Sequence, residues 1–223
     1  MNAHRALVFL ALLATAFFAR AGESVTIEPR APSSYSATRP AYLFFKKIVI
    51  TRQSKTTYDF DITLQGPMPK DSTAELGLRY KIYFDFDGVQ VSNPEVTKTP
   101  GFSDDMIVNV FRNPGDPSFR PWLSSLEIRR KVFEVKILQL SLQNDSIFIS
   151  AQSPLFARDI KTNVVFSSGL LVKKQGSSLR DWGGQNTRPA DLNTGTPLAS
   201  AKPDDKPDDE SQDEPSLGSL LKP

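Results

Sequence analysis

The sequence predicts an all-β protein, a single antiparallel β-sandwich of the jelly-roll or immunoglobulin-like type followed by a disordered C-terminal tail. Two observations lead to this fold class. Several segments alternate apolar and polar residues with the period of two that is typical of half-buried strands. Turn residues, chiefly Gly, Pro, Asn and Asp, separate these segments at short intervals. A chain of 223 residues is large enough for one such domain with tails.

The clearest strand runs from Leu78 to Asp87 and leads into a loop that is rich in carboxylates and ends at Asp105. We expect this strand to be half-buried and central to the sandwich. Its alternation is strict. One face carries Leu78, Tyr80, Ile82, Phe84 and Phe86, and the outward face carries Arg79, Lys81, Tyr83, Asp85 and Asp87.

The same reasoning predicts strands at 42–51, 57–64, 106–111, 126–137, 147–151 and 163–172. Two changes of phase need an explanation: a bulge or break near 129–131, and a tight helical turn over 138–142. If the strands at 57–64 and 78–87 are neighbours, Asp59 and Asp61 can pair with Arg79 and Lys81. Such cross-strand pairs contribute about 0.2–1 kcal/mol each.

Residues 1–21 have the pattern of a secretory signal peptide. His4 and Arg5 form a basic start, 6–18 is an apolar run, and Ala19-Arg20-Ala21 fits a cleavage site. The run is shorter than the ~20 residues of a membrane-spanning helix. We therefore expect a periplasmic or secreted protein with no membrane span after cleavage.

Three further segments follow the expected cleavage site. Residues 22–41 contain three prolines and predict an extended leader that can pair at a sheet edge. The β-sandwich domain is expected over 42–176. Residues 177–223 include KPDDKPDDESQDEP and have too few apolar side chains to offset the cost of ordering, which predicts a disordered tail.

Absent residue types restrict the chemistry. The chain has no cysteine, and its one histidine, His4, lies in the expected signal peptide. A Ser-His-Asp triad, a cysteine nucleophile and an ordinary zinc site are therefore excluded from the mature chain. A cysteine-free exported domain also favours a bacterial source. We expect no catalysis; the catalytic alternatives are a carboxylate-based glycosidase and a Ser-Lys hydrolase.

Charge argues against nucleic acid as a partner. Arg5 and Arg20 are two of the 27 basic residues, so the mature chain balances 25 acidic residues with 25 basic ones. The body is mildly basic and the tail is acidic. This small and scattered excess does not form the basic stripe of a nucleic-acid groove.

One run of motifs resembles a known group of folds. The block YKIYFDFDG, the loop ending GFSDD, the strand MIVNVF and the segment FEVKILQLSLQNDSIFISAQ occur in this order. The order resembles the DOMON-like and family 9 carbohydrate-binding-module-like β-sandwiches of secreted bacterial proteins, over roughly 43–172. The resemblance implies a sugar or, in some relatives, haem as ligand. Haem is disfavoured because the usual axial histidine is absent.

Two sets of residues are candidate sites. Phe119, Arg120 and Trp122, together with Tyr83, are a candidate platform for stacking sugars or a partner. The structural alternative is a tryptophan that folds down to plug one end of the sandwich.

A second set consists of oxygen ligands for a structural calcium ion, the one cofactor that we consider. These are Asp85, Asp87, Asp104 and Asp105. The alternative is that these carboxylates cap turns and form ion pairs.

The sequence thus predicts an exported, non-catalytic binding module, either carbohydrate-binding or associated with the cell surface. The alternative is a structural or assembly protein of the cell envelope that acts through protein–protein contacts. An exposed Trp122 favours the first function. A buried Trp122 beside an exposed apolar strand edge favours the second.

Overall fold

The computed structural model describes residues 23–29, 39–70, 73, 76–86, 105–128, 131–157, 162–173 and 179–197. The expected signal peptide at 1–21 lies outside these residues, and so do 30–38 of the leader and 198–223 of the expected tail.

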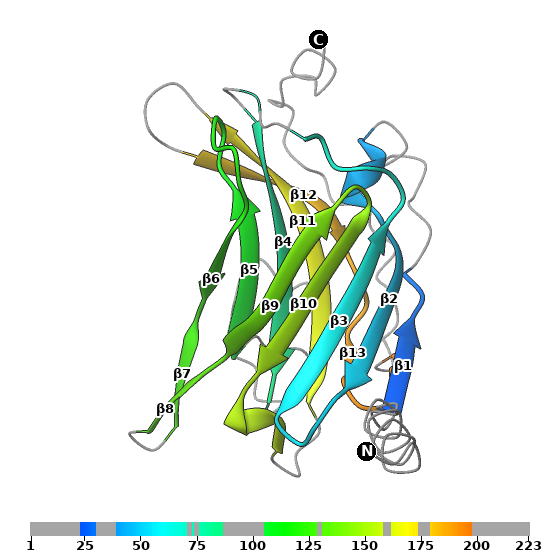
Figure 1. Ribbon diagram of the computed structural model, residues 1–223, viewed down its shortest axis with the longest axis vertical. Helices are drawn as coiled ribbons and strands as arrows, with labels where there is room; N and C mark the ends of the chain where they lie inside the picture. The colour runs from blue at the N-terminus through cyan, green and yellow to red at the C-terminus, as the bar shows by residue number, and fades with distance from the viewer. Residues whose placement is uncertain are drawn as a thin grey trace, which may run out of the picture.

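The described residues form two antiparallel sheets (Figure 1). The order in the first sheet is β1 (Glu23–Ile27), β2 (Phe45–Arg52), β3 (Thr57–Leu64), β10 (Ser146–Gln152) and β9 (Lys136–Gln143). The order in the second sheet is β12 (Leu179–Asn186), β11 (Asn163–Lys173), β4 (Leu76–Asp85), β5 (Met106–Arg112) and β6 (Arg120–Leu123), and β13 (Ala190–Asp191) also pairs with β11. A small hairpin of β7 (Ser125–Ile128) and β8 (Lys131–Glu134) leads from the second sheet to the first.

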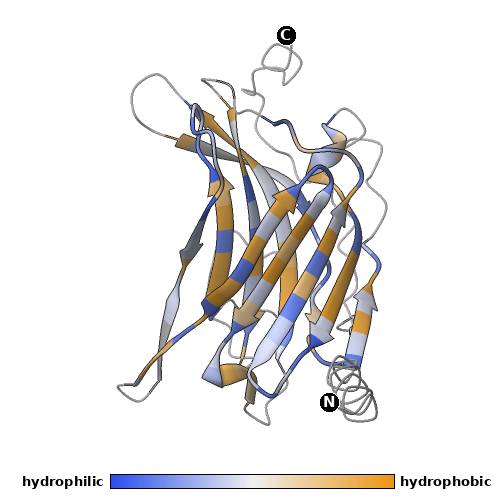
Figure 2. Cartoon of the chain, in the orientation of Figure 1, coloured by the Kyte–Doolittle hydropathy of each residue, from blue (hydrophilic) through white to orange (hydrophobic). Residues whose placement is uncertain are grey.

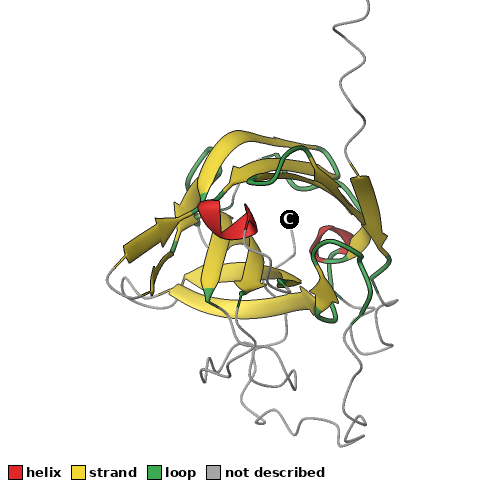
Figure 3. Cartoon of the chain, turned by 90° about the horizontal axis from the view of Figure 1, so that it is seen from below, coloured by secondary structure: helices red, strands yellow, loops and turns green. Residues whose placement is uncertain are grey.

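The two sheets pack face to face, which confirms the predicted β-sandwich. Seen at right angles to the first view, the strands form two curved layers around an interior (Figure 3). Apolar and hydrophilic residues are interleaved along the strands, as the period of two requires (Figure 2). Each sheet turns its apolar side chains towards the other.

Aromatic rings from both sheets meet at the centre of the core. The ring centroid of Phe60 on β3 lies 5.9 Å from that of Phe84 on β4 and 6.0 Å from that of Phe166 on β11. All three side chains are fully buried. Phe156, in the short 3-10 turn η3 (Pro154–Ala157), packs against Phe84 and Tyr58 and closes one end. Burial of each such side chain stabilises the fold by about 1.5–3 kcal/mol.

The strand predicted to be central is β4, and it does lie in the middle of its sheet. The prediction that it is half-buried was wrong, because its outward face is also covered. Lys81 is 7% exposed, Tyr83 is 2% exposed and Asp85 is fully buried. Tyr83 and Val165 form a small apolar cluster of their own on this face, with Ile107 packed against it.

The predicted pairing of Asp59 and Asp61 with Arg79 and Lys81 was also wrong. β3 and β4 follow each other in the chain but belong to different sheets. Asp61 lies between Val49 and Phe148 on the neighbouring strands, and Asp59 accepts a hydrogen bond from the Gln53 amide at 2.7 Å.

The expected helical turn over 138–142 is instead part of a continuous strand. In β9, Gln139 pairs with Ser150 and Ile137 pairs with Ala151, so Leu138 is an extra residue in a β-bulge. The bulge changes the phase of the alternation, as a helical turn would, and leaves Leu138 56% exposed.

The start of the tail at 177 was wrong, because β12 and β13 extend the second sheet well beyond that residue. Gln185 on β12 accepts a hydrogen bond from the backbone N–H of Phe45 at 2.7 Å, which links the two sheets. The leader behaves as expected where it is described, since β1 pairs with β2 at the edge of the first sheet. None of the described residues lies in a helix long and apolar enough to span a bilayer.

Candidate binding site

The predicted platform is built on β6, an edge strand of the second sheet in the part of the chain that is described. β6 pairs with β5 so that Trp122 lies opposite Asn109 and Arg120 lies opposite Phe111. Successive side chains of a strand point to opposite faces, so Trp122 and Arg120 share the outer face of the sandwich. Trp122 is 52% exposed. It does not plug the sandwich.

Two polar side chains, Arg120 and Asn109, lie next to Trp122 in the sheet. Arg120 is exposed and lies 3.8 Å from a carboxylate oxygen of Asp116. Such a surface pair stabilises by at most about 1 kcal/mol, so the guanidinium can exchange this contact for another. The side-chain oxygen of Asn109 is buried without a hydrogen-bond partner among the described residues. An exposed indole next to an exposed guanidinium has the mixed apolar and polar character of a sugar-stacking surface.

Phe119 does not belong to this face. It precedes β6 and points inwards, where it packs against the core. Its ring centroid lies 4.8 Å from the guanidinium carbon of Arg112 and 6.3 Å from the ring centroid of Tyr80. Tyr83 is separate as well, since it is buried on β4 and its ring lies 5.4 Å from the ammonium of Lys81. The structure therefore keeps Trp122 and Arg120 together and removes Phe119 and Tyr83 from the exposed platform.

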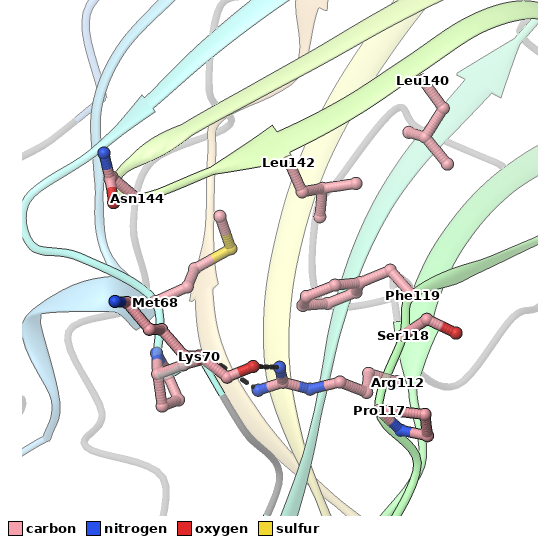
Figure 4. Close-up of a pocket in the computed structure, with 10 residues that line it drawn as sticks. Met68, Lys70, Arg112, Pro117, Ser118, Phe119, Leu140, Leu142 and Asn144 are labelled. Atoms are coloured by element: carbon pink, nitrogen blue, oxygen red, sulfur yellow. Dashed lines mark hydrogen bonds between the residues drawn. The ribbon is translucent and has the colours of Figure 1, made fainter.

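A cavity of about 460 Å³ opens where Phe119 points (Figure 4). It lies between the edge strand β9 of the first sheet and the β5–β6 corner of the second. Its volume falls in the range of ligand-binding sites, about 300–1,000 Å³. The residues that line it come from the β3–β4 loop, the end of β5, the β5–β6 loop, β9 and the β9–β10 turn. They are Met68, Pro69, Lys70, Arg112, Pro117, Ser118, Phe119, Leu140, Leu142 and Asn144.

Arg112 is the buried cation of this region. It is 2% exposed, and its guanidinium donates hydrogen bonds to the carbonyl of Lys70 at 2.7 Å and to that of Pro69 at 2.9 Å. Burial raises the pKa of the neighbouring Tyr42 and Tyr80, and the positive charge of Arg112 lowers both in part. The hydroxyl of Tyr80 donates to the carbonyl of Tyr42 at 3.0 Å.

Sequence reasoning missed this cavity. One signal was available. The inward positions of β5 are every second residue, and the first three are apolar: Met106, Val108 and Val110. The next inward position is occupied by the charged Arg112. A basic residue at an inward position of a strand, where apolar residues are expected, indicates either a buried polar network or a binding site.

A second cavity of about 320 Å³ lies at the opposite edge of the sandwich. It is lined by Ile27, Glu28, Pro29, Thr187, Arg188, Ala190 and Pro197.

Of the four carboxylates predicted to bind calcium, Asp87 and Asp104 lie outside the described residues. The two other carboxylates serve the chain itself. Asp105 accepts a hydrogen bond from the backbone N–H of Phe86 at 2.6 Å, and Asp85 accepts one from the Asn163 amide at 3.4 Å. Within the described ranges, no three Asp, Glu, His or Cys side chains gather closely enough to hold a metal ion.

The carboxylate pair on β3 lines neither of these two cavities. Partial burial raises the pKa of Asp61, and the negative charge of Asp59 adds to the effect. A glycosidase needs its two carboxylates on opposite sides of a substrate cleft. These two lie side by side on one face of a strand.

Comparison with known proteins identifies no relative. The chain matches no family model, no curated protein and no solved structure.

Proposed function

We propose that this protein is an exported, non-catalytic binding module that holds carbohydrate on the outer face of β6. The observation that carries the proposal is the exposure of Trp122, at 52%, on an edge strand next to the exposed Arg120. An indole presents a flat apolar face that can stack on a sugar ring, and the guanidinium can donate hydrogen bonds to the ring's hydroxyl groups. Export to the periplasm or the medium, and the resemblance to carbohydrate-binding sandwiches, belong to the same proposal.

A second function has its own support. Val132 on β8 is 62% exposed and Leu138 on β9 is 56% exposed, beside an edge of the first sheet. Exposed apolar residues at an open strand edge are typical of surfaces that bind another protein. The alternative is therefore an assembly protein of the cell envelope that uses the β8–β9 edge.

A glycan array separates the two functions. The mature chain, 22–223, is applied with and without a chelator, next to Trp122→Ala and the matched control Leu138→Ala. Each variant replaces an exposed apolar side chain on an edge strand. We expect Trp122→Ala to weaken glycan binding by about tenfold or more, as the loss of a central aromatic contact does. The Leu138 variant should bind like the parent chain.

Two results would contradict the carbohydrate proposal. If the chain binds none of the glycans, the carbohydrate-binding function is excluded and the assembly function remains. Binding that Trp122→Ala leaves unchanged would show that the site is not on β6. Loss of binding with the chelator would support the calcium hypothesis for the loop that contains Asp87 and Asp104.

A further inference from the structure

The two long sides of the sandwich differ. On one side, the turn after β13 packs against β1, since Gly195 lies against Val25 and the hydroxyl of Tyr58 donates to the Asn193 side chain. On the other side, β6 and β9 are the edge strands of their sheets within the described residues. The inward side chains of these two strands are less well covered than those of the inner strands. Leu123, Ile137, Leu140 and Leu142 are only partly buried.

The cavity described above lies at one end of this open side. Phe119, Leu140, Leu142 and Met68 point into it from three different segments (Figure 4). These side chains form the apolar wall of a space that no other side chain of the described residues fills. An apolar ligand group that covers this surface removes it from contact with water, which favours binding.

The walls of the cavity are held in place by backbone contacts. The N–H of Met68 donates to the carbonyl of Asn144 at 2.7 Å, which ties the β3–β4 loop to the β9–β10 turn. Arg112 ties the same loop to β5 through the carbonyls of Pro69 and Lys70. The cavity is therefore formed before any ligand arrives, which reduces the entropy lost on binding.

The two charged residues that line the cavity, Lys70 and Arg112, are both basic. Lys70 is exposed and lines the cavity, Arg112 lies beside it in the wall, and none of the lining residues is acidic. Ser118 and Asn144 add hydrogen-bonding groups. An apolar wall next to a lysine is complementary to an apolar chain that ends in a negative charge.

We propose that this cavity binds a single-chain amphiphile with an anionic head group, a carboxylate or a phosphate. The aliphatic chain lies against Phe119, Leu140 and Leu142, and the head group pairs with Lys70. The site is distinct from the carbohydrate surface, because Phe119, just before β6, packs against the core, whereas Trp122 lies on the outer face of β6. Either site can therefore be lost without the other.

The chain length of the ligand is the first test. Titration calorimetry of the full mature chain with octanoate, decanoate and dodecanoate, below their micelle concentrations, should give saturable binding. Each added methylene should strengthen binding by up to about fourfold until the cavity is full. Dodecyl phosphate distinguishes a phosphate head from a carboxylate. Absence of saturable binding for all four ligands would overturn the proposal.

The head group is the second test. Decanoate should bind about fivefold more tightly than decanol, and Lys70→Gln should abolish this difference. Lys136→Gln is the control, since Lys136 is an exposed lysine on β9 that does not line the cavity. Equal affinity of the parent chain for decanoate and decanol would refute the anionic ligand.

Substitutions of two leucines in β9 test where the ligand binds. Leu142→Gln places a polar group in the apolar wall and should weaken decanoate binding by about tenfold. Leu138→Gln makes the same change at the exposed bulge and should not. Equal weakening by both would exclude the cavity as the site. Circular dichroism shows whether each variant folds. If Leu142→Gln does not fold, Lys70→Gln still tests the site, because Lys70 is exposed. Trp122→Ala should leave decanoate binding unchanged.

Discussion

At the scale of single residues, Tyr80 shows how the sandwich treats a polar group in its core. Its side chain is 2% exposed, and its hydroxyl donates to the Tyr42 carbonyl. Burial raises the pKa of Tyr80 above its usual value of 10.0, the Tyr42 phenol adds to this, and Arg112 opposes it. As the pH rises above about 10, the unfolded chain releases a proton that the folded chain keeps. Tyr80 therefore stabilises the fold fully below pH 10 and loses that effect as the pH rises towards the folded pKa.

Replacement of this tyrosine should separate the two effects. We expect Tyr80→Phe to lower the free energy of unfolding by about 1 kcal/mol at pH 7, because the hydrogen bond is lost. It should also make stability fall less steeply above pH 10. Urea denaturation at pH 7 and pH 11 measures both. Tyr42→Phe is the control at pH 7, since it keeps the backbone carbonyl that Tyr80 uses. An unchanged alkaline slope in Tyr80→Phe would refute the role of Tyr80.

At the scale of elements, the close approach of β4 to the end of β5 depends on Gly77. A Cβ atom at this position would lie 2.2 Å from the carbonyl oxygen of Arg112 and 2.9 Å from Cδ of Pro114. No side chain fits there unless the backbone of β5 moves. The contact therefore helps to fix where Arg112 enters the cavity wall.

We expect Gly77→Ala to destabilise the fold by about 1–3 kcal/mol, as overpacking does. In a domain of this size the melting temperature should fall by several degrees, since each kcal/mol corresponds to about 2–4 °C. Gly183→Ala on β12 is a matched control, because a Cβ atom there meets nothing within 4 Å. That variant should change stability by less than about 0.5 kcal/mol. Equal thermal melts for the two variants would contradict the close approach.

The sequence predicted the individual strands, but it did not predict which strands pair with each other. The alternation of Tyr58, Phe60, Ile62 and Leu64 is contained in eight residues, and β3 has the predicted bounds. No local pattern says that β3 pairs with β2 and β10 and not with β4. The mistaken pairing of Asp59 and Asp61 arose at this step, because packing across the whole molecule decides which strands meet.

At the scale of the whole molecule, the end of the domain is set by long-range pairing. β12 and β13 cover an edge of β11, and Leu192 donates its N–H to the carbonyl of Thr162 at 2.8 Å. Gly, Ser, Pro and charged residues from 175 onwards predicted a tail. Backbone hydrogen bonds do not depend on side-chain hydropathy, so β12 forms in a segment of low apolar content.

Two truncations locate this boundary. A chain of residues 22–197 should melt at the temperature of residues 22–223, because the composition of 198–223 predicts disorder. A chain that ends at 176 should lose its cooperative transition, because the outer edge of β11 is then uncovered and Phe45 loses its hydrogen bond to Gln185. Differential scanning calorimetry measures both. An unaltered transition in the shorter chain would restore the tail boundary at 177.

The sequence by itself determined the all-β class and most of the strands. These properties depend on residue types and on alternation over a few neighbours. Only the tertiary structure decided that Trp122 is exposed, that Phe119 and Tyr83 turn away from it, and that Arg112 meets Phe119 at a cavity. The physical reason is that a strand's period fixes which side chains share a face, whereas the packing of two sheets fixes what lies opposite that face.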